Sequence, residues 1–473
     1  GAGPYNVPKG ALYRYDPKSE SWTDVSPLKP NEADHFGYGA VAVDRERPGT
    51  LIVSTIDRWT KGGEIFRSTD GAKTWKPLMA NAQLDSGGAP YVYAHQAKIS
   101  APQWVDDVEI DPFDSNHAAL ITGAGSWATE DLAAADGDHP THWTFRNQNL
   151  EETVVLGMVS PPTGAPLLTA MGDLCGFRHD TLEASPSRGS FDHPLCANST
   201  AIDYAEKKPD YVVRVGSYPW DGSKGPRGAL SHDGGASWTE LASEPPGCGG
   251  SGTVALSADG AVIVWASRDA RPAYSNNSGA TWGDAAGLPD PAKIPDWAPH
   301  NLRLASDRMN PKKFYAFDAG NGTAYASNDG GAHFRVSARG LPSLPNYDLG
   351  SASIQAVPGY EGDIWVTSGK ELYRSTDSGG SYAALSSAEE AYSVGFGHAP
   401  PGKKYPAIYL TGKVQGVTGF FRSDDEGHSF SRINDDAHQY GGSHLVIGDP
   451  RVYGRVYVAG SGRGVLCGEP INQ

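Results

Sequence analysis

A short turn sequence recurs along the chain and constrains its fold more than any other feature. Its pattern is Ser-x-Asp-x-Gly-x-x-aromatic, the Asp-box. In such a turn the Asp side chain accepts backbone N–H bonds, glycine supplies positive φ, and the aromatic ring packs between neighbouring sheets. The copies occupy residues 67–75, 230–238, 274–282, 326–334, 374–382 and 422–430.

The spacing of the boxes predicts the repeating unit. The box serines from Ser231 onward lie at positions 231, 275, 327, 375 and 423, so the steps are 44, 52, 48 and 48 residues. A strand, a proline-bearing turn and a second strand precede the boxes, as in residues 304–318. Four short strands in about 50 residues are typical of one propeller blade. We therefore expect an all-β chain of the Asp-box β-propeller class.

Two further units have degenerate boxes, and they set the expected domain boundaries. One ends at Trp22 and the other at Trp143, and the interval from Trp143 to Trp238 holds two blades, the first ending near Phe177. Seven units from Trp143 to Phe430 predict one complete seven-bladed propeller. We therefore predict a complete C-terminal propeller at 96–435, the remainder of a first propeller at 1–95, and terminal strands at 436–473 that close the first propeller.

Charge and hydropathy exclude several classes of partner. The net charge is −16 and no basic cluster occurs, which argues against nucleic acid or an anionic membrane. No apolar run approaches the roughly 18 residues of a membrane-spanning helix. An acidic, aromatic-rich chain fits a neutral polymer better.

The cysteines leave two interpretations open. The chain has four, and none forms a CxxC pair, so we expect no zinc site, and no other metal or cofactor is predicted. Cys175 and Cys196 lie 21 residues apart in a loop-rich segment. They either pair in an oxidising compartment or remain two buried free thiols.

Two strings are more specific than the boxes. "EIDPFDSNH" occupies residues 109–117 and "GDLCGF" occupies residues 172–177. With "GALYRYDPKSESWTDVSP" near the start and "VYVAGSGRGV" near the end, in this order, the chain resembles glycoside hydrolase family 74, the xyloglucanases. The resemblance covers nearly the whole chain.

The resemblance implies a fold and an activity. It implies tandem seven-bladed propellers, secretion, and inverting cleavage of the β-1,4-glucan backbone of xyloglucan, a plant cell-wall polysaccharide. It makes Asp173, the aspartate of the "GDxxGF" motif, the general acid. The base would come from a "TDxGG" turn in the first propeller. No segment here matches that turn, so the chain is expected to begin inside the first propeller and to depend on the missing N-terminal segment.

The residues around Asp173 favour two different roles. Inversion needs two carboxyl groups about 6.5–9.5 Å apart, and the acid must retain its proton near the working pH. Asp173 follows an apolar run and precedes Phe177, which suggests a desolvating pocket, and His179 could orient it or bind sugar hydroxyls. Alternatively, Asp173 sits in the Asp-box place of a blade whose box is broken and only caps the turn.

Aromatic residues outside the boxes are candidates for stacking on sugar rings. We predict substrate contacts at Trp59, Trp104, Trp127, Tyr93 and Phe177, with packing inside loops as the alternative. The box aspartates are expected to be structural. A propeller that binds a glycan or a protein without cutting it is the alternative function. A sialidase is a weaker one, because neither its arginine triad nor a Phe-Arg-Ile-Pro stretch is evident.

Overall fold

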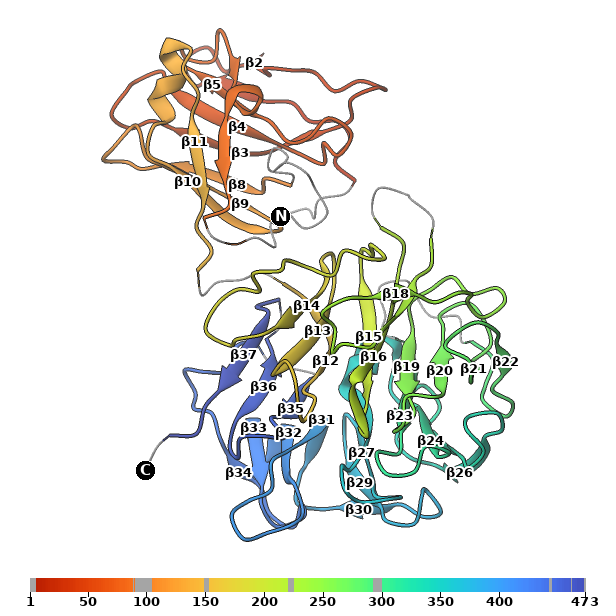
Figure 1. Cartoon of the computed structure of the whole chain (residues 1–473). Helices are drawn as coiled ribbons and strands as arrows, with labels where there is room; N and C mark the ends of the chain where they lie inside the picture. Colours follow the sequence, from red (N-terminus) through yellow and green to blue (C-terminus); the bar gives the residue numbers. More distant parts are fainter. Residues whose placement is uncertain are drawn as a thin grey trace. The chain divides into compact units, whose positions relative to one another are not determined.

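The computed structural model describes residues 6–87, 89, 104–148, 153–219, 225–291, 300–441, 445–460 and 462–471. The secondary structure in these residues is almost entirely β, as predicted (Figure 1). Three short 3-10 helices are also present, η1 (Met79–Asn81), η3 (Leu132–Gly137) and η4 (Asn346–Ser351). Contacts divide the chain into two compact units, Gly1–Glu152 and Thr153–Gln473.

The described part of the second unit contains seven antiparallel sheets in chain order. The first and last have three strands, β12 (Val155–Val159), β13 (Leu167–Met171) and β14 (Cys175–His179), and β35 (Val446–Gly448), β36 (Val456–Ala459) and β37 (Val465–Gly468).

The five sheets between them have four strands each, and consecutive strands are neighbours. They are β15 (Ser199–Ala205), β16 (Lys208–Gly216), β17 (Gly228–Ser231) and β18 (Thr239–Glu240); β19 (Thr253–Leu256), β20 (Ile263–Ala266), β21 (Ala273–Ser275) and β22 (Gly283–Asp284); β23 (Leu302–Ser306), β24 (Phe314–Asp318), β25 (Thr323–Ser327) and β26 (Arg335–Arg339); β27 (Ala352–Ala356), β28 (Ile364–Ser368), β29 (Leu372–Ser375) and β30 (Ala383–Leu385); and β31 (Glu390–Gly397), β32 (Ala407–Val414), β33 (Val417–Ser423) and β34 (Ser431–Arg432).

The first strands of the seven sheets surround one axis. Each contacts the first strand of the next sheet, from β12 through β35. A cavity of about 130 Å³ is lined by at least one residue from every one of these strands, for example Met158, Ile202, Val254, Leu304, Gln355, Gly395 and Ile447. Seven sheets around a shared axis are the arrangement of a β-propeller.

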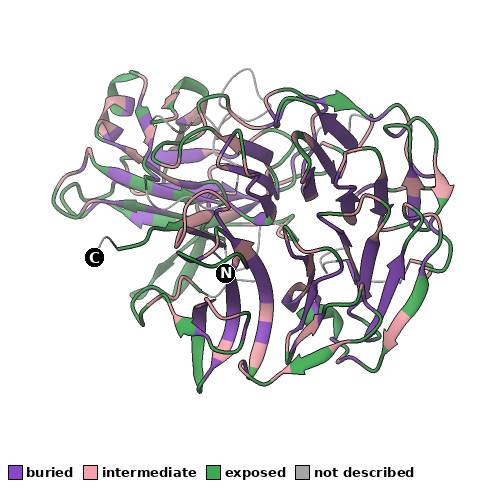
Figure 2. Ribbon diagram, turned by 60° about the horizontal axis from the view of Figure 1, so that its bottom comes forward, coloured by how far each residue is buried: buried purple, intermediate pink, exposed green. Residues whose placement is uncertain are grey.

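Burial follows from this arrangement, because each sheet is covered on both faces by its neighbours. All five residues of β13, β24 and β28 are buried, whereas the short fourth strands are largely exposed (Figure 2). The box aromatics pack between sheets as predicted. Trp238, for example, belongs to the same core cluster as Leu168 of the preceding sheet.

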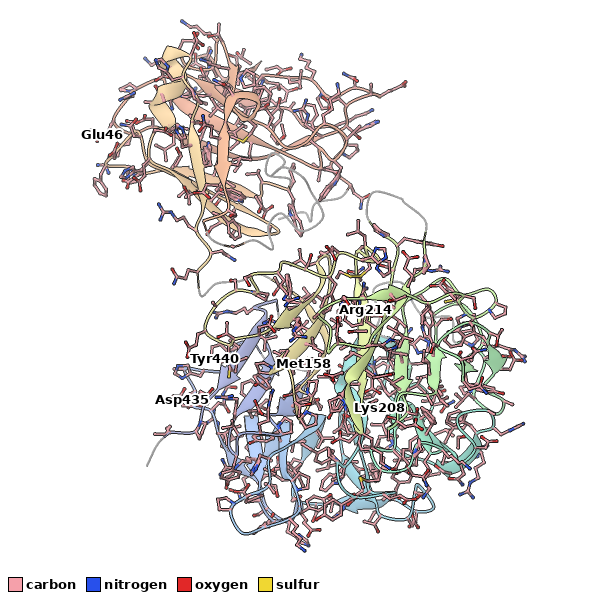
Figure 3. All side chains as sticks on the ribbon, in the orientation of Figure 1. Glu46, Met158, Lys208, Arg214, Asp435 and Tyr440 are labelled. Atoms are coloured by element: carbon pink, nitrogen blue, oxygen red, sulfur yellow. A yellow bond between two sulfur atoms is a disulfide. The ribbon has the colours of Figure 1, made fainter. Side chains whose placement is uncertain are left out.

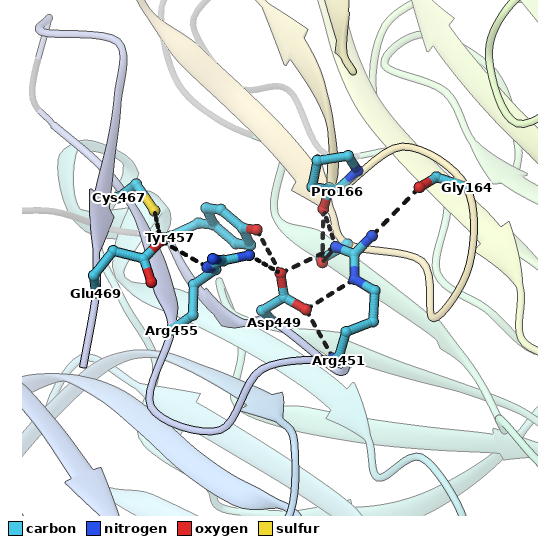
Figure 4. Close-up of polar contacts among 9 residues, drawn as sticks. Gly164, Pro166, Asp449, Arg451, Arg455, Tyr457, Cys467 and Glu469 are labelled. Atoms are coloured by element: carbon cyan, nitrogen blue, oxygen red, sulfur yellow. Dashed lines mark hydrogen bonds and ion pairs between the residues drawn. The ribbon is translucent and has the colours of Figure 1, made fainter. Parts of the chain in front are cut away.

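Polar contacts join the last sheet to the first (Figure 4). Arg451, in the β35–β36 turn, donates to the Pro166 carbonyl at 2.7 Å and to the Ser160 hydroxyl at 3.0 Å, both between β12 and β13. Asp449 is fully buried and holds Arg451 through an ion pair of 2.9 Å. The Gly464 N–H also donates to the Thr153 carbonyl. The C-terminal strands therefore complete the second unit.

The Asp-boxes have the predicted geometry, shown by the turn between β17 and β18. Asp233 Oδ1 accepts the backbone N–H of Ser237 and the hydroxyl of Ser231, both at 2.8 Å. Asp233 Oδ2 accepts the Ser237 hydroxyl. Gly234 and Gly235 both have positive φ. The other five boxes repeat the contact from serine to the aspartate or asparagine, at Asp70, Asn277, Asp329, Asp377 and Asp425.

The described part of the first unit contains three sheets. The first is the hairpin of β1 (Tyr13–Asp16) and β2 (Ser21–Asp24). The second comprises β3 (Gly37–Val43), β4 (Leu51–Ile56), β5 (Ile65–Ser68) and β6 (Lys76–Pro77), and the third comprises β7 (Gln83–Asp85), β11 (His142–Phe145), β10 (Gly125–Thr129), β9 (Ala118–Thr122) and β8 (Asp107–Ile110) in spatial order.

These assignments correct the predicted domain boundaries. The division lies after residue 152 and not at 95/96, because the strand that contains Trp143 belongs to the third sheet of the first unit. The strands after residue 435 form the seventh sheet of the second unit and do not close the first. The error arose because the last sheet has no box aromatic and could not be counted by that signal.

Among the described residues, we find no helix of sufficient length and hydropathy to cross a bilayer.

Candidate functional site

Asp173 lies at the end of its sheet that is opposite to the Asp-boxes. The pairing of Met171 with Cys175 places Asp173 in the turn between β13 and β14, the second and third strands. The boxes lie between third and fourth strands, as at β17–β18. Because neighbouring strands are antiparallel, successive turns alternate between the two ends of a sheet. The prediction that Asp173 occupies a broken Asp-box was therefore wrong.

The turn of Asp173 is tight and solvent-facing. Asp173 has φ +62° and Cys175 has φ +62°, conformations that non-glycine residues rarely adopt. The Asp173 side chain is exposed. Its backbone N–H donates to Asn198 Oδ1 at 2.8 Å. The turn thus presents a carboxylic acid outward at a fixed place.

The structure places Asp173 on an exposed turn, which differs from the desolvating setting predicted from the sequence. Phe177 is buried inside the blade, and its ring contacts the His179 ring at a centroid distance of 6.3 Å. Alternate strand residues face opposite sides of a sheet, so a nearby position in sequence does not by itself place the Phe177 ring against Asp173.

His179 also lies away from Asp173. It ends β14, and the four steps from Cys175 to His179 place it about 13 Å along the strand from the turn of Asp173. Its Nε2 contacts the Thr169 hydroxyl at 3.2 Å, and burial lowers the pKa of His179 to about 4. The predictions that His179 orients Asp173 and that Phe177 stacks on sugar beside it are therefore corrected.

The cysteine question is resolved by a disulfide between Cys175 and Cys196, whose Cα atoms are 5.2 Å apart. It ties β14 to the loop that leads into β15. Asn198, which accepts the N–H of Asp173, follows Cys196 by two residues. The disulfide therefore lies directly behind the turn.

Arg214 lies on β16 of the next sheet (Figure 3), and its guanidinium contacts both sulfurs of this disulfide. The side chain is fully buried. Its Nη1 donates to the sulfurs of Cys175 and Cys196 at 3.2 and 3.3 Å, and its Nη2 donates to the carbonyls of His193 and Pro194. Burial lowers the pKa of Arg214 to about 9.

Trp127 does not have an open ring face. It lies within β10, is 3% exposed, and contacts the Phe145 ring at a centroid distance of 5.1 Å. The sequence suggested a loop, but "GSWAT" is a strand with alternating burial. The prediction that Trp127 stacks on sugar is corrected for this reason.

Trp59 and Trp104 remain candidates in the first unit. Trp59 is 39% exposed in the β4–β5 turn, and its indole N–H donates to Asp57. That turn joins second and third strands, like the turn of Asp173. Trp104 is half-buried against Gly123. Tyr93 lies outside the described residues.

Three residues connected to the turn of Asp173, Asn198, Arg214 and Tyr218, were missed from the sequence. Asn198 and Arg214 carry no motif, and only the pairing of strands brings them to the turn. Tyr218 is 37% exposed, follows β16, and its carbonyl accepts the Ala197 N–H. Arg227 covers one face of its ring at 4.4 Å.

Known proteins similar to this chain agree on one family. The chain is 40% identical to a xyloglucanase of a Paenibacillus species over an alignment of 499 residues, covering all of this chain and 46% of the relative. It is 38% identical to a xyloglucanase of Acetivibrio thermocellus, covering 99% of this chain and 55% of that protein. No protein-family model matches it.

A solved structure gives the same assignment. The crystal structure of the GH74 xyloglucanase from Xanthomonas campestris aligns with a TM-score of 0.83 and 39% identity, covering 98% of this chain and 63% of that one. The chain belongs to glycoside hydrolase family 74. The chain spans about half the length of the two xyloglucanases named above, 46% and 55%, and it spans 63% of the Xanthomonas chain.

Proposed function

We propose that this family 74 chain acts in hydrolysis of the β-1,4-glucan backbone of xyloglucan, with Asp173 as general acid and inversion at the anomeric carbon. The relatives named xyloglucanase support the substrate class. The observation that best supports the role of Asp173 as general acid is its position in the fold. It is an exposed carboxyl on a positive-φ turn at the end of the ring that the structural box aspartates do not occupy.

The proposed chemistry assigns one proton transfer to this residue. The protonated Asp173 carboxyl gives its proton to the glycosidic oxygen as the C1–O bond breaks. A water attacks C1 from the opposite face, and a second carboxylate takes the proton of that water. We assign no residue of this chain to the second carboxylate.

The exposure of Asp173 sets a condition on the mechanism. A general acid must hold its proton when the substrate is bound. We propose that bound glucan excludes water from Asp173 and so favours the protonated carboxyl. Tyr218, in the same unit as Asp173, is the described aromatic that we propose as a stacking surface, and Trp59 and Trp104 stay separate candidates within the first unit.

The direct test is release of reducing sugar from tamarind xyloglucan by the wild-type protein and by Asp173→Ala. We expect a loss of about 10²–10⁴-fold, the usual contribution of a general acid. Asp377→Ala is the matched control, because this box aspartate accepts bonds from Ser375 and Ser381 within its own turn. Equal activity of Asp173→Ala and wild type would remove Asp173 from the mechanism.

Binding of xyloglucan without turnover by the wild-type chain would instead favour the non-catalytic alternative. We also propose that the protein works outside the cell. The Cys175–Cys196 disulfide supports this, since such bonds persist in oxidising compartments.

A further inference from the structure

The turn that carries Asp173 is held by its backbone N–H groups, and one of them is bound differently from the others. The Gly172 N–H donates to the Val154 carbonyl, the Leu174 N–H to the Gly172 carbonyl, and the Cys175 N–H to the Ala197 carbonyl. The Asp173 N–H donates to a side chain, Oδ1 of Asn198, at 2.8 Å. A single substitution can therefore remove the partner of the Asp173 amide.

Asn198 is itself fixed by the neighbouring sheet. Its backbone N–H donates to the Ser217 hydroxyl at 3.1 Å, and its carbonyl accepts the Ser217 N–H at 2.8 Å. Gly216 has no space for a Cβ, which would lie 2.1 Å from the Asn198 carbonyl oxygen. The backbone of Asn198 is thus held closely against the end of β16.

The loop before Asn198 is held by one buried cation. Arg214 donates to both disulfide sulfurs and to the carbonyls of His193 and Pro194. The guanidinium also lies 5.4 Å from the ring centre of Phe191 and 4.9 Å from that of Trp238. All of these hydrogen bonds and ring contacts are made to this loop or lie at the interface between the first two sheets of the unit. Such a set of contacts is unusual because arginine is rarely fully buried.

We propose that Asn198 is a positioning residue for Asp173, and that the Cys175–Cys196 disulfide and Arg214 hold Asn198 in register. This inference rests on the proposed role of Asp173 as general acid. Asn198 fixes the left-handed conformation of Asp173 and thereby the direction from which its carboxyl approaches the leaving oxygen. Small displacements of a catalytic group lower rates strongly, so the contact acts on catalysis through Asp173.

The test compares two substrates that differ in their need for an acid. When the substrate is a xyloglucan oligosaccharide, the leaving group is a sugar alkoxide that must be protonated. When it is a 2,4-dinitrophenyl glycoside of the same oligosaccharide, the leaving group is 2,4-dinitrophenolate, which departs without a proton. In the full-length protein, Asn198→Ala should lose about tenfold in kcat/KM on the first substrate, the value of about one hydrogen bond. It should lose less than about twofold on the second.

Two variants make the result specific. Asn198→Asp retains an acceptor oxygen and should restore most of the rate, while its added negative charge raises the pKa of Asp173 and moves the alkaline limb of the pH profile upward. Asn301→Ala is the matched control. Asn301 precedes β23 as Asn198 precedes β15, and its carbonyl likewise accepts an N–H after the second strand, from Ala319.

The outcomes separate the two proposals. Equal losses of Asn198→Ala on both substrates, or no loss, would overturn the positioning role. If Asp173→Ala shows no selective loss of kcat/KM on the oligosaccharide, the proposed role of Asp173 as general acid is wrong, whatever the result for Asn198→Ala. Hydrogen exchange adds a readout that needs no turnover, because Asn198→Ala should speed exchange in peptides spanning 172–175 about tenfold and Asn301→Ala should not. Unchanged exchange in that turn contradicts the proposal.

Discussion

Two aspartate turns in the second unit are held by different groups. Asp233 turns both carboxylate oxygens inward onto Ser231 and Ser237. Asp173 is held through its backbone by Asn198, and its side chain is exposed at the other end of its sheet. The comparison teaches that the two turns are closed by different groups: the box turn by the aspartate side chain itself, and the turn of Asp173 by backbone carbonyls and the Asn198 side chain.

The first way to break this comparison is to make the same substitution in both turns. Asp173→Asn should lower kcat on xyloglucan by about 10²–10⁴-fold, because an amide donates no proton to the leaving oxygen. Asp233→Asn should leave kcat unchanged. Asn277 already fills a box, where its Oδ1 accepts the Thr281 N–H at 3.0 Å. Steady-state kinetics with matched circular dichroism spectra measure both, and equal losses would contradict the assignment.

The second prediction concerns the support behind Asp173. Arg214→Met should lower the free energy of unfolding of the second unit by about 2–4 kcal/mol, because the carbonyls of His193 and Pro194 lose their buried donor. Urea denaturation measures the effect. The control Arg335→Met, on an exposed strand residue, should stay within about 0.5 kcal/mol. A stability of Arg214→Met equal to that of the control would show that the cation is dispensable.

The third prediction uses the pH dependence of the boxes. Burial opposes ionisation of Asp233, but hydrogen bonds from Ser237 and Ser231 outweigh it and lower its pKa. A lowered pKa in the folded state adds stability above the unfolded pKa of about 4, and that stability is lost as pH falls through the folded value.

Asp233→Asn should therefore lose less stability than wild type between about pH 4 and pH 2. Thermal unfolding at a series of pH values measures this difference. If the stability of the two proteins fell in parallel as the pH is lowered, the box carboxylate would not contribute to the pH dependence of stability.

The smallest expected effect is at Tyr218. Arg227 covers one face of the ring, and the residue is 37% exposed, so we propose that a sugar stacks on its exposed side. Tyr218→Ala should raise KM for xyloglucan about three- to tenfold with little change in kcat, as expected for loss of binding that is equal in ground and transition states. Tyr347→Ala, an exposed tyrosine at η4, is the control. A fall in kcat without a change in KM would place Tyr218 in the chemistry instead.

The sequence predicted the repeat well and the site only in part. The boxes gave the blade period and the structural role of their aspartates, because both are set by residues within one turn. The boundary at 152 and the seventh sheet escaped prediction, since the ring closes through Arg451 and Asp449, which are far from Pro166 in sequence. The motif made Asp173 a candidate, and its role stays a prediction. The end of the sheet at which Asp173 lies, and the link from Asn198 and Arg214 to its turn, depend on pairing between strands.

The central claim is that Asp173 gives a proton to the leaving group. The most direct measurement is kcat/KM of Asp173→Ala relative to wild type over aryl glycosides of one xyloglucan oligosaccharide, with leaving groups of falling pKa. The account predicts a loss of about 10²–10⁴-fold for poor leaving groups that shrinks toward about onefold for 2,4-dinitrophenol. A loss of the same size with every leaving group would contradict it.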